Sequence, residues 1–143
     1  MGSNNNQIQV SGLPARNHIS FLFTSPGKTG GNDTTSLQFN NTGTVYSFNF
    51  NLNNTANQFS AQSTINLTGS INYAERYEGE CSLIGASRYL GLVRGTMNAA
   101  SFPDNLEGAF NYGDTALSIV TFKTLGGSVQ FLSGTELLVF GRN

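Results

Sequence analysis

Apolar and polar side chains alternate along much of this 143-residue chain. The clearest example is YSFNFNLN, residues 46–53, in which every second residue is aromatic or aliphatic and the residues between are serine or asparagine. A period of two residues is typical of a strand with one buried face. Residues 46–53 therefore predict a β-strand.

The same alternation recurs in shorter stretches separated by turn-forming residues. The stretches are HISFLFT, TINLTGSINYAERY, LEGAFNY, ALSIVTFK, SVQFLS and ELLVFG, with GLVRGTMN as a strand interrupted by glycines. Between them lie TSPGKTGGND, NNTG, LNNTANQ, SFPDN, YGD and LGG, whose residues tolerate positive φ or fix a turn. No stretch shows a convincing helical period, so the pattern predicts about eight strands.

Strand length favours a barrel over a sandwich. Residues 63–77 contain no strong strand breaker except Gly69, and a strand of that length has to coil, with a glycine allowing the bend. We therefore expect an all-β fold, an eight-stranded antiparallel up-and-down barrel. Residues 7–143 would form this single domain, and residues 1–6 a disordered tail or a cloning remnant.

Composition excludes several classes of partner. The net charge is −1 and only 10% of the residues are charged, so no basic surface is available for nucleic acid. No apolar run approaches the roughly 20 residues that cross a bilayer. One cysteine and one histidine are too few for a disulfide or a Cys/His metal site. We expect no cofactor, no metal, no nucleic acid and no membrane partner.

Charge is concentrated in INYAERYEGE, residues 71–80. Glu75 shares the parity of the apolar residues of this stretch, so it is expected to face the interior, where a carboxylate needs a cation or hydrogen-bond donors. Arg88 and Arg94 are the candidate cations. Glu78 and Glu80 are expected in solvent, although a bulge near Gly79 would turn one of them inward. The candidate donors are Tyr46, Tyr73, Tyr77, Tyr89 and Tyr112.

The next stretch, IGASRYLGLVRGTMNAASF at residues 84–102, resembles a segment of the allene oxide cyclase and dirigent barrels. The matching residues are Gly85, Ser87, Tyr89, Gly91 and Gly95. RYLGL is also similar to a pattern in the spirotetronate Diels–Alderases, which share that barrel. The resemblance covers about thirty residues and departs from the family at Arg88, where glycine is common. Gly91 and Gly95 are expected to let the barrel coil or to leave cavity space.

The resemblance implies a cofactor-free cyclase or isomerase that folds an apolar, flexible substrate inside the barrel. Glu75, Tyr77 and Arg94 would then be catalytic. The substrate-binding residues would be Tyr46, Phe48, Phe50, Tyr73, Tyr89 and Tyr112. Related barrels assemble as homodimers or homotrimers, and ELLVF, apolar on both parities, is expected to have a covered outer face.

The alternative hypothesis is a noncatalytic β-barrel or sandwich module that binds carbohydrate or acts as an adhesin through its Asn- and Thr-rich loops. The orientation of Glu75 discriminates between the two hypotheses.

Three other residues are candidates for chemistry. His18 is a possible general base, but the sequence identifies no serine or cysteine partner for it. Cys81 lies beside glutamates, which raise a thiol pKa, so we expect it to be a packing residue. Lys28 lies in TSPGKTGGND, which lacks the spacing of a phosphate-binding loop. We interpret that segment as a hairpin loop or as a lid over a barrel mouth.

Overall fold

The computed structural model describes residues 5–14, 17–40, 46–53, 55–67, 72–85, 88–98, 103–113 and 117–143. Within these ranges the protein consists of strands and connecting turns without a helix, and every strand pair is antiparallel. The all-β prediction is confirmed. Ser87 and most of the loop around NNTG lie outside the described residues.

The strands form three sheets. The seven-stranded sheet has the order β13 (Glu136–Arg142), β2 (His18–Ser25), β8 (Glu75–Ile84), β9 (Arg88–Asn98), β10 (Pro103–Tyr112), β5 (Tyr46–Leu52) and β6 (Thr55–Gln62). The four-stranded sheet has the order β1 (Gln7–Val10), β11 (Val120–Thr124), β4 (Thr35–Phe39) and β7 (Ile65–Asn66). A small ribbon pairs β12 (Gln130–Phe131) with β3 (Lys28–Thr29).

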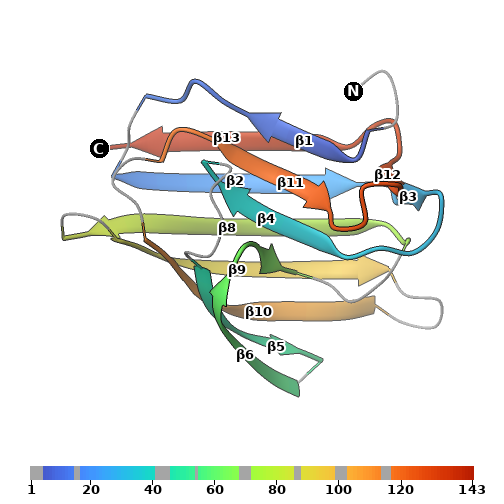
Figure 1. Cartoon of the computed structure of the whole chain (residues 1–143), viewed down its shortest axis with the longest axis horizontal. Helices are drawn as coiled ribbons and strands as arrows, with labels where there is room; N and C mark the ends of the chain where they lie inside the picture. Colours follow the sequence, from blue (N-terminus) through green and yellow to red (C-terminus); the bar gives the residue numbers. More distant parts are fainter. Residues whose placement is uncertain are drawn as a thin grey trace.

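The two larger sheets lie face to face, with β1, β11 and β4 in front of the seven-stranded sheet in Figure 1. No pairing among the described strands joins the two ends of a sheet, so no closed barrel is found. The up-and-down order is also not observed, because β2 lies between β13 and β8. Strands distant in sequence are therefore neighbours in the sheet.

The long strand predicted over residues 63–77 is wrong. Ile65–Asn66 pairs with β4 in the four-stranded sheet, whereas β8 begins at Glu75 and pairs with β2 and β9 in the other sheet. The chain passes from one sheet to the other between these strands, and residues 68–71 are outside the described ranges. Apolar and polar residues alternate through the whole segment, but its first part pairs with β4 and its last part pairs with β2 and β9.

Aromatic rings from both sheets fill the space between them. Phe23 of β2 stacks on Phe122 of β11 with ring centroids 4.3 Å apart and an interplanar angle of 3°. Phe39 of β4 packs on Phe110 of β10 at 5.7 Å. Such pairs add roughly 0.5–1.5 kcal/mol to the stabilisation from burying their area. These contacts join the two sheets through one hydrophobic core.

Glycines on the inner face provide room for these rings. A Cβ atom at Gly91 would lie 2.4 Å from Cζ of Phe110, and one at Gly95 would lie 2.2 Å from Cδ1 of Tyr77. The space expected at Gly91 and Gly95 is therefore occupied by aromatic side chains of neighbouring strands. The same arrangement pairs Gly79 with Phe21 and Gly108 with Phe50.

The close contact between Gly95 and the Tyr77 ring can be tested by substitution. Gly95→Ala is expected to lower the free energy of unfolding by about 1–3 kcal/mol, because the new methyl group overlaps the Tyr77 ring. Gly113→Ala is the matched control, since a Cβ there meets nothing within 4 Å. Urea denaturation measures both variants. Equal stability of the two would contradict this packing.

Candidate functional site

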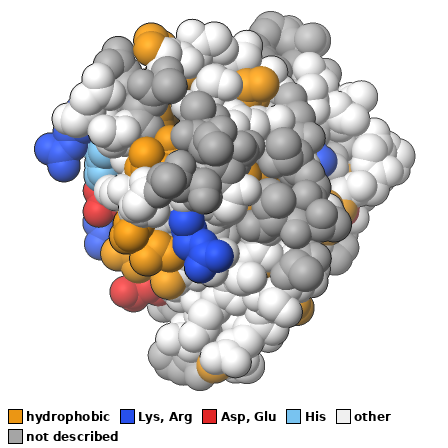
Figure 2. All heavy atoms as spheres, turned by 60° about the vertical axis from the view of Figure 1, so that its left-hand side comes forward, with side chains coloured by type: hydrophobic (Ala, Val, Ile, Leu, Met, Phe, Trp, Pro, Cys, Tyr) orange, Lys and Arg blue, Asp and Glu red, His pale blue; other side chains and the backbone are white. Residues whose placement is uncertain are grey.

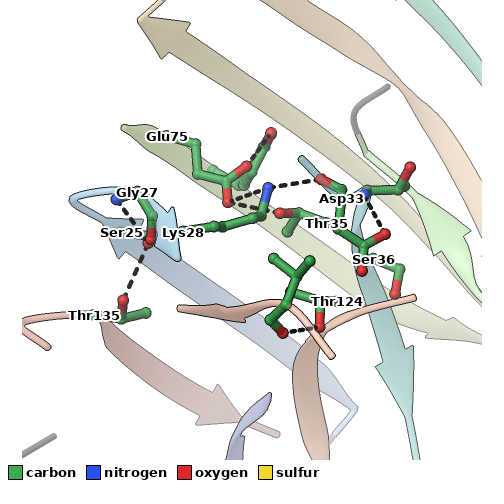
Figure 3. A network of polar contacts seen from close by, with 12 residues as sticks. Ser25, Gly27, Lys28, Asp33, Thr35, Ser36, Glu75, Thr124 and Thr135 are labelled. Atoms are coloured by element: carbon green, nitrogen blue, oxygen red, sulfur yellow. Dashed lines mark hydrogen bonds and ion pairs between the residues drawn. The ribbon is translucent and has the colours of Figure 1, made fainter. Parts of the chain in front are cut away.

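Glu75 faces the interior, as its parity predicts, and its carboxylate is surrounded by partners. The residue is 4% exposed. Its Oε1 accepts a hydrogen bond from Thr35 Oγ1 at 2.6 Å and lies 3.1 Å from Lys28 Nζ (Figure 3). Its Oε2 accepts a hydrogen bond from the Tyr77 hydroxyl at 3.0 Å. The cation is Lys28, so the prediction that Arg88 or Arg94 pairs with Glu75 is wrong.

Lys28 is held in place by its strand and by a second hydrogen bond. It lies in β3, opposite Phe131 of β12, and Nζ donates to the backbone oxygen of Asp33 at 3.0 Å. Burial lowers the pKa of Lys28 below 10.5, and the neighbouring Glu75 carboxylate opposes that shift. This role was not predicted, because a lysine among glycines is typical of a loop.

The other predicted interior residues are mostly packing residues. The Tyr46 hydroxyl donates to the backbone oxygen of Phe39 at 2.9 Å, and the Tyr89 hydroxyl accepts from the backbone N–H of Leu117 at 3.2 Å. Phe48, Phe50 and Tyr112 are also buried in the core. These hydroxyls and rings stabilise the contact between the sheets.

Two of the predicted site residues lie apart from this interior group. Tyr73 is 40% exposed. Arg94 points to the opposite face of the seven-stranded sheet, where it binds Glu78. The structure therefore brings Glu75 and Tyr77 together but separates both from Arg94.

A row of polar side chains crosses the outer face of the seven-stranded sheet. Residues directly opposite each other on paired strands share a face, and the register here aligns Glu78 of β8, Arg94 of β9, Glu107 of β10 and Asn51 of β5. Arg76 Nη2 donates to Glu78 Oε2 at 3.0 Å, and Arg94 Nε donates to Glu78 Oε1. Four neighbouring strands thus present one polar row.

A second row, two residues along each strand, is more apolar. It aligns Phe140, Ser20, Glu80, Leu92, Ala109 and Asn49. Leu92 and Phe140 are 59% and 61% exposed, so the face expected to be covered at ELLVF is open in the single chain. The two rows line a groove of about 780 Å³. Figure 2 shows hydrophobic side chains beside positively and negatively charged ones on one face of the molecule.

Neighbouring side chains shift the pKa values of two residues of β8, Glu78 and Cys81. A hydrogen bond from Arg94 is the main cause that lowers the pKa of Glu78 below 4.5, and the charges of Arg94 and Arg76 add to it. Glu78 therefore remains an ionised hydrogen-bond acceptor in neutral solution. On the inner side of the same strand, burial and then the charge of Glu80 raise the pKa of the Cys81 thiol to about 12. Cys81 is a packing residue, as predicted.

Neither protein-family models nor curated proteins match this chain. Within the described ranges, no group of three or more His, Cys, Asp or Glu side chains is arranged to hold a metal ion. The described part also has no helix suited to spanning a membrane.

The interior ion pair makes a stability prediction. Lys28→Met leaves the buried Glu75 carboxylate without its cation, so the free energy of unfolding is expected to fall by about 3–5 kcal/mol. Replacing both residues, as Lys28→Met with Glu75→Leu, removes the unpaired charge and should recover most of that loss. Chemical denaturation measures both proteins. A single variant as stable as the original protein would contradict the pairing.

The outer charges make a prediction for titration. Arg94→Ala removes the principal cause of the lowered pKa of Glu78, so that pKa should rise toward 4.5. Glu78 stabilises the fold above the unfolded value of 4.5 and loses this contribution as pH falls through its lower folded pKa. Carboxyl ¹³C NMR follows the titration, with Arg88→Ala as the control. An unchanged Glu78 midpoint in Arg94→Ala would refute the assignment.

Proposed function

We propose that this protein is a carbohydrate-binding module whose ligand lies in the groove on the outer face of the seven-stranded sheet. The observation that carries the proposal is the polar row Glu78, Arg94, Glu107 and Asn51 beside the apolar side chains of Leu92 and Phe140. A sugar ring requires both kinds of surface, since it has hydroxyl groups at its edge and C–H groups on its faces.

The polar row offers complementary hydrogen bonding. Each sugar hydroxyl donates one hydrogen bond and accepts others. Carboxylates only accept, guanidinium groups only donate, and the Asn51 amide does both. Charged partners strengthen such bonds. Because Glu78 is held by Arg76 and Arg94, its carboxylate is oriented before a ligand arrives, which reduces the entropy lost on binding.

The apolar row offers a surface for the sugar face. Leu92 and Phe140 project into solvent. Ala109 lies on β10, between β9 and β5, and its small side chain leaves space above the sheet. The groove volume of about 780 Å³ lies within the range of ligand sites, roughly 300–1,000 Å³. Several sugar units could lie along such a surface.

The charge balance favours a neutral saccharide. Glu78, Glu80 and Glu107 line the groove with Arg94, and Arg76 lies beside it. Acidic side chains therefore outnumber basic ones, and a polyanionic chain would be repelled. The proposed site lies on strands, whereas the sequence pattern favoured binding through Asn- and Thr-rich loops.

An allene oxide cyclase-like barrel with cofactor-free cyclase or isomerase activity is the second candidate. The inward-facing Glu75 and its hydrogen bond with Tyr77 favour it. It ranks second because Lys28 and Thr35 already occupy the carboxylate, and because Arg94, the third proposed catalytic residue, lies on the other face of the sheet.

Binding to neutral oligosaccharides tests the proposal. A panel of neutral and acidic oligosaccharides is titrated by isothermal calorimetry, and saturable binding is expected with neutral members. Asn51→Ala should weaken binding about fivefold, since a lost hydrogen bond is worth about 1 kcal/mol. Leu92→Ala should also weaken it through lost contact area.

Asn57→Ala and Leu125→Ala are the matched controls, because neither residue lines the groove. Equal effects of the groove variants and their controls would contradict the proposed site. Saturable binding of none of the saccharides would reject the function.

A further inference from the structure

A serine, a histidine and a glutamate meet at one end of the outer face. His18 of β2 lies directly opposite Ser82 of β8, and Ser20 lies opposite Glu80. His18 Nδ1 is 2.8 Å from Ser82 Oγ, and Nε2 is 3.5 Å from Glu80 Oε2 and 3.3 Å from Ser20 Oγ. The fold therefore places the Ser82 hydroxyl beside His18, a partner that the sequence alone did not identify.

The chemistry of these groups favours one histidine tautomer. A neutral imidazole has one N–H donor and one acceptor nitrogen, and an ionised carboxylate only accepts. Glu80 therefore favours the proton on Nε2, which leaves Nδ1 to accept the Ser82 hydroxyl. The His18 side chain is only 17% exposed, so the strand and its neighbours hold it in this orientation.

We propose that Ser82, His18 and Glu80 form a nucleophilic site that hydrolyses carboxylic esters with an apolar acyl group. Ser82 is the nucleophile, and His18 is its general base. Glu80 is a positioning residue that stabilises the imidazolium formed when His18 takes the serine proton. The 3.5 Å separation from Glu80 is compatible with a contact that tightens once substrate is bound.

The substrate class follows from the side chains next to Ser82. Leu90 lies directly opposite Ser82 in β9, and Leu92 lies opposite Glu80. Both are exposed, at 45% and 59%, and offer a surface for an acyl chain. Arg142 of β13 lies opposite His18 on its other side, and its cationic side chain is the candidate for stabilising the oxyanion.

The reaction balances without a cofactor. Ser82 Oγ bonds to the carbonyl carbon while its proton passes to His18 Nδ1, and the bond between that carbon and the alcohol oxygen breaks as the alcohol takes the proton. Water then attacks the acyl-serine with His18 again accepting the proton. The carboxylic acid leaves, and the proton returns to Ser82.

A fluorophosphonate probe and p-nitrophenyl butyrate test the site without any saccharide, so the result is independent of the proposed binding function. The probe should phosphonylate the full chain at Ser82 with loss of fluoride, as located by peptide mass spectrometry. Ser82→Ala should abolish both the adduct and the hydrolysis. His18→Gln should slow both reactions about 100-fold, the usual scale of general-base catalysis.

Ser11→Ala is the control, because Ser11 lies outside this group and is expected to leave both rates unchanged. Glu80→Gln should lower kcat for the ester with little change in KM, a division that a purely structural role would not produce. Thermal unfolding checks each variant, and His18→Asn replaces His18→Gln should the latter fail to fold. Labelling of other serines at the same rate, no adduct at all, or a Ser82 adduct indifferent to His18 would overturn the proposal.

Discussion

The buried contact between Lys28 and Glu75 connects the three sheets that the described strands form. Lys28 belongs to the small ribbon, Glu75 to the seven-stranded sheet, and Thr35, which donates to the same carboxylate, to the four-stranded sheet. Desolvation of two charges offsets much of their attraction, so the pair adds little net stability, whereas the loss of one partner leaves a costly unpaired charge in the interior. Any slip of β3, β4 or β8 by one residue would separate the groups and leave a charge buried alone.

Strand alternation divides the residues of β8 between two roles. Glu75, Tyr77 and Cys81 point inward, where the carboxylate is engaged and the rings are packed. The residues between them point outward, and Glu78 there belongs to the polar row of the groove. The inward side chains therefore pack the two sheets together, whereas the outward side chains are accessible to a ligand. This division is why we assign function to the outside of the sheet.

The sequence predicted which face of a strand a residue occupies better than it predicted which strands pair with each other. The strand at residues 46–53 and the inward position of Glu75 follow from a period of two, and both are observed. The same pattern contains no information on which strands pair, so it missed the crossing near Ile65 and the register that joins His18 to Ser82. Lys28 was missed for another reason, because a two-residue strand among glycines has no periodicity to detect.

The most direct test of where this protein acts is a map of amide chemical shifts during titration with a neutral oligosaccharide that binds. We expect saturable changes at Glu78, Arg94 and Glu107 across the polar row, while Lys28 and Thr35 in the interior stay unchanged. Shifts centred on the Lys28 and Glu75 pair would instead place the ligand between the sheets and contradict the assignment to the outer face.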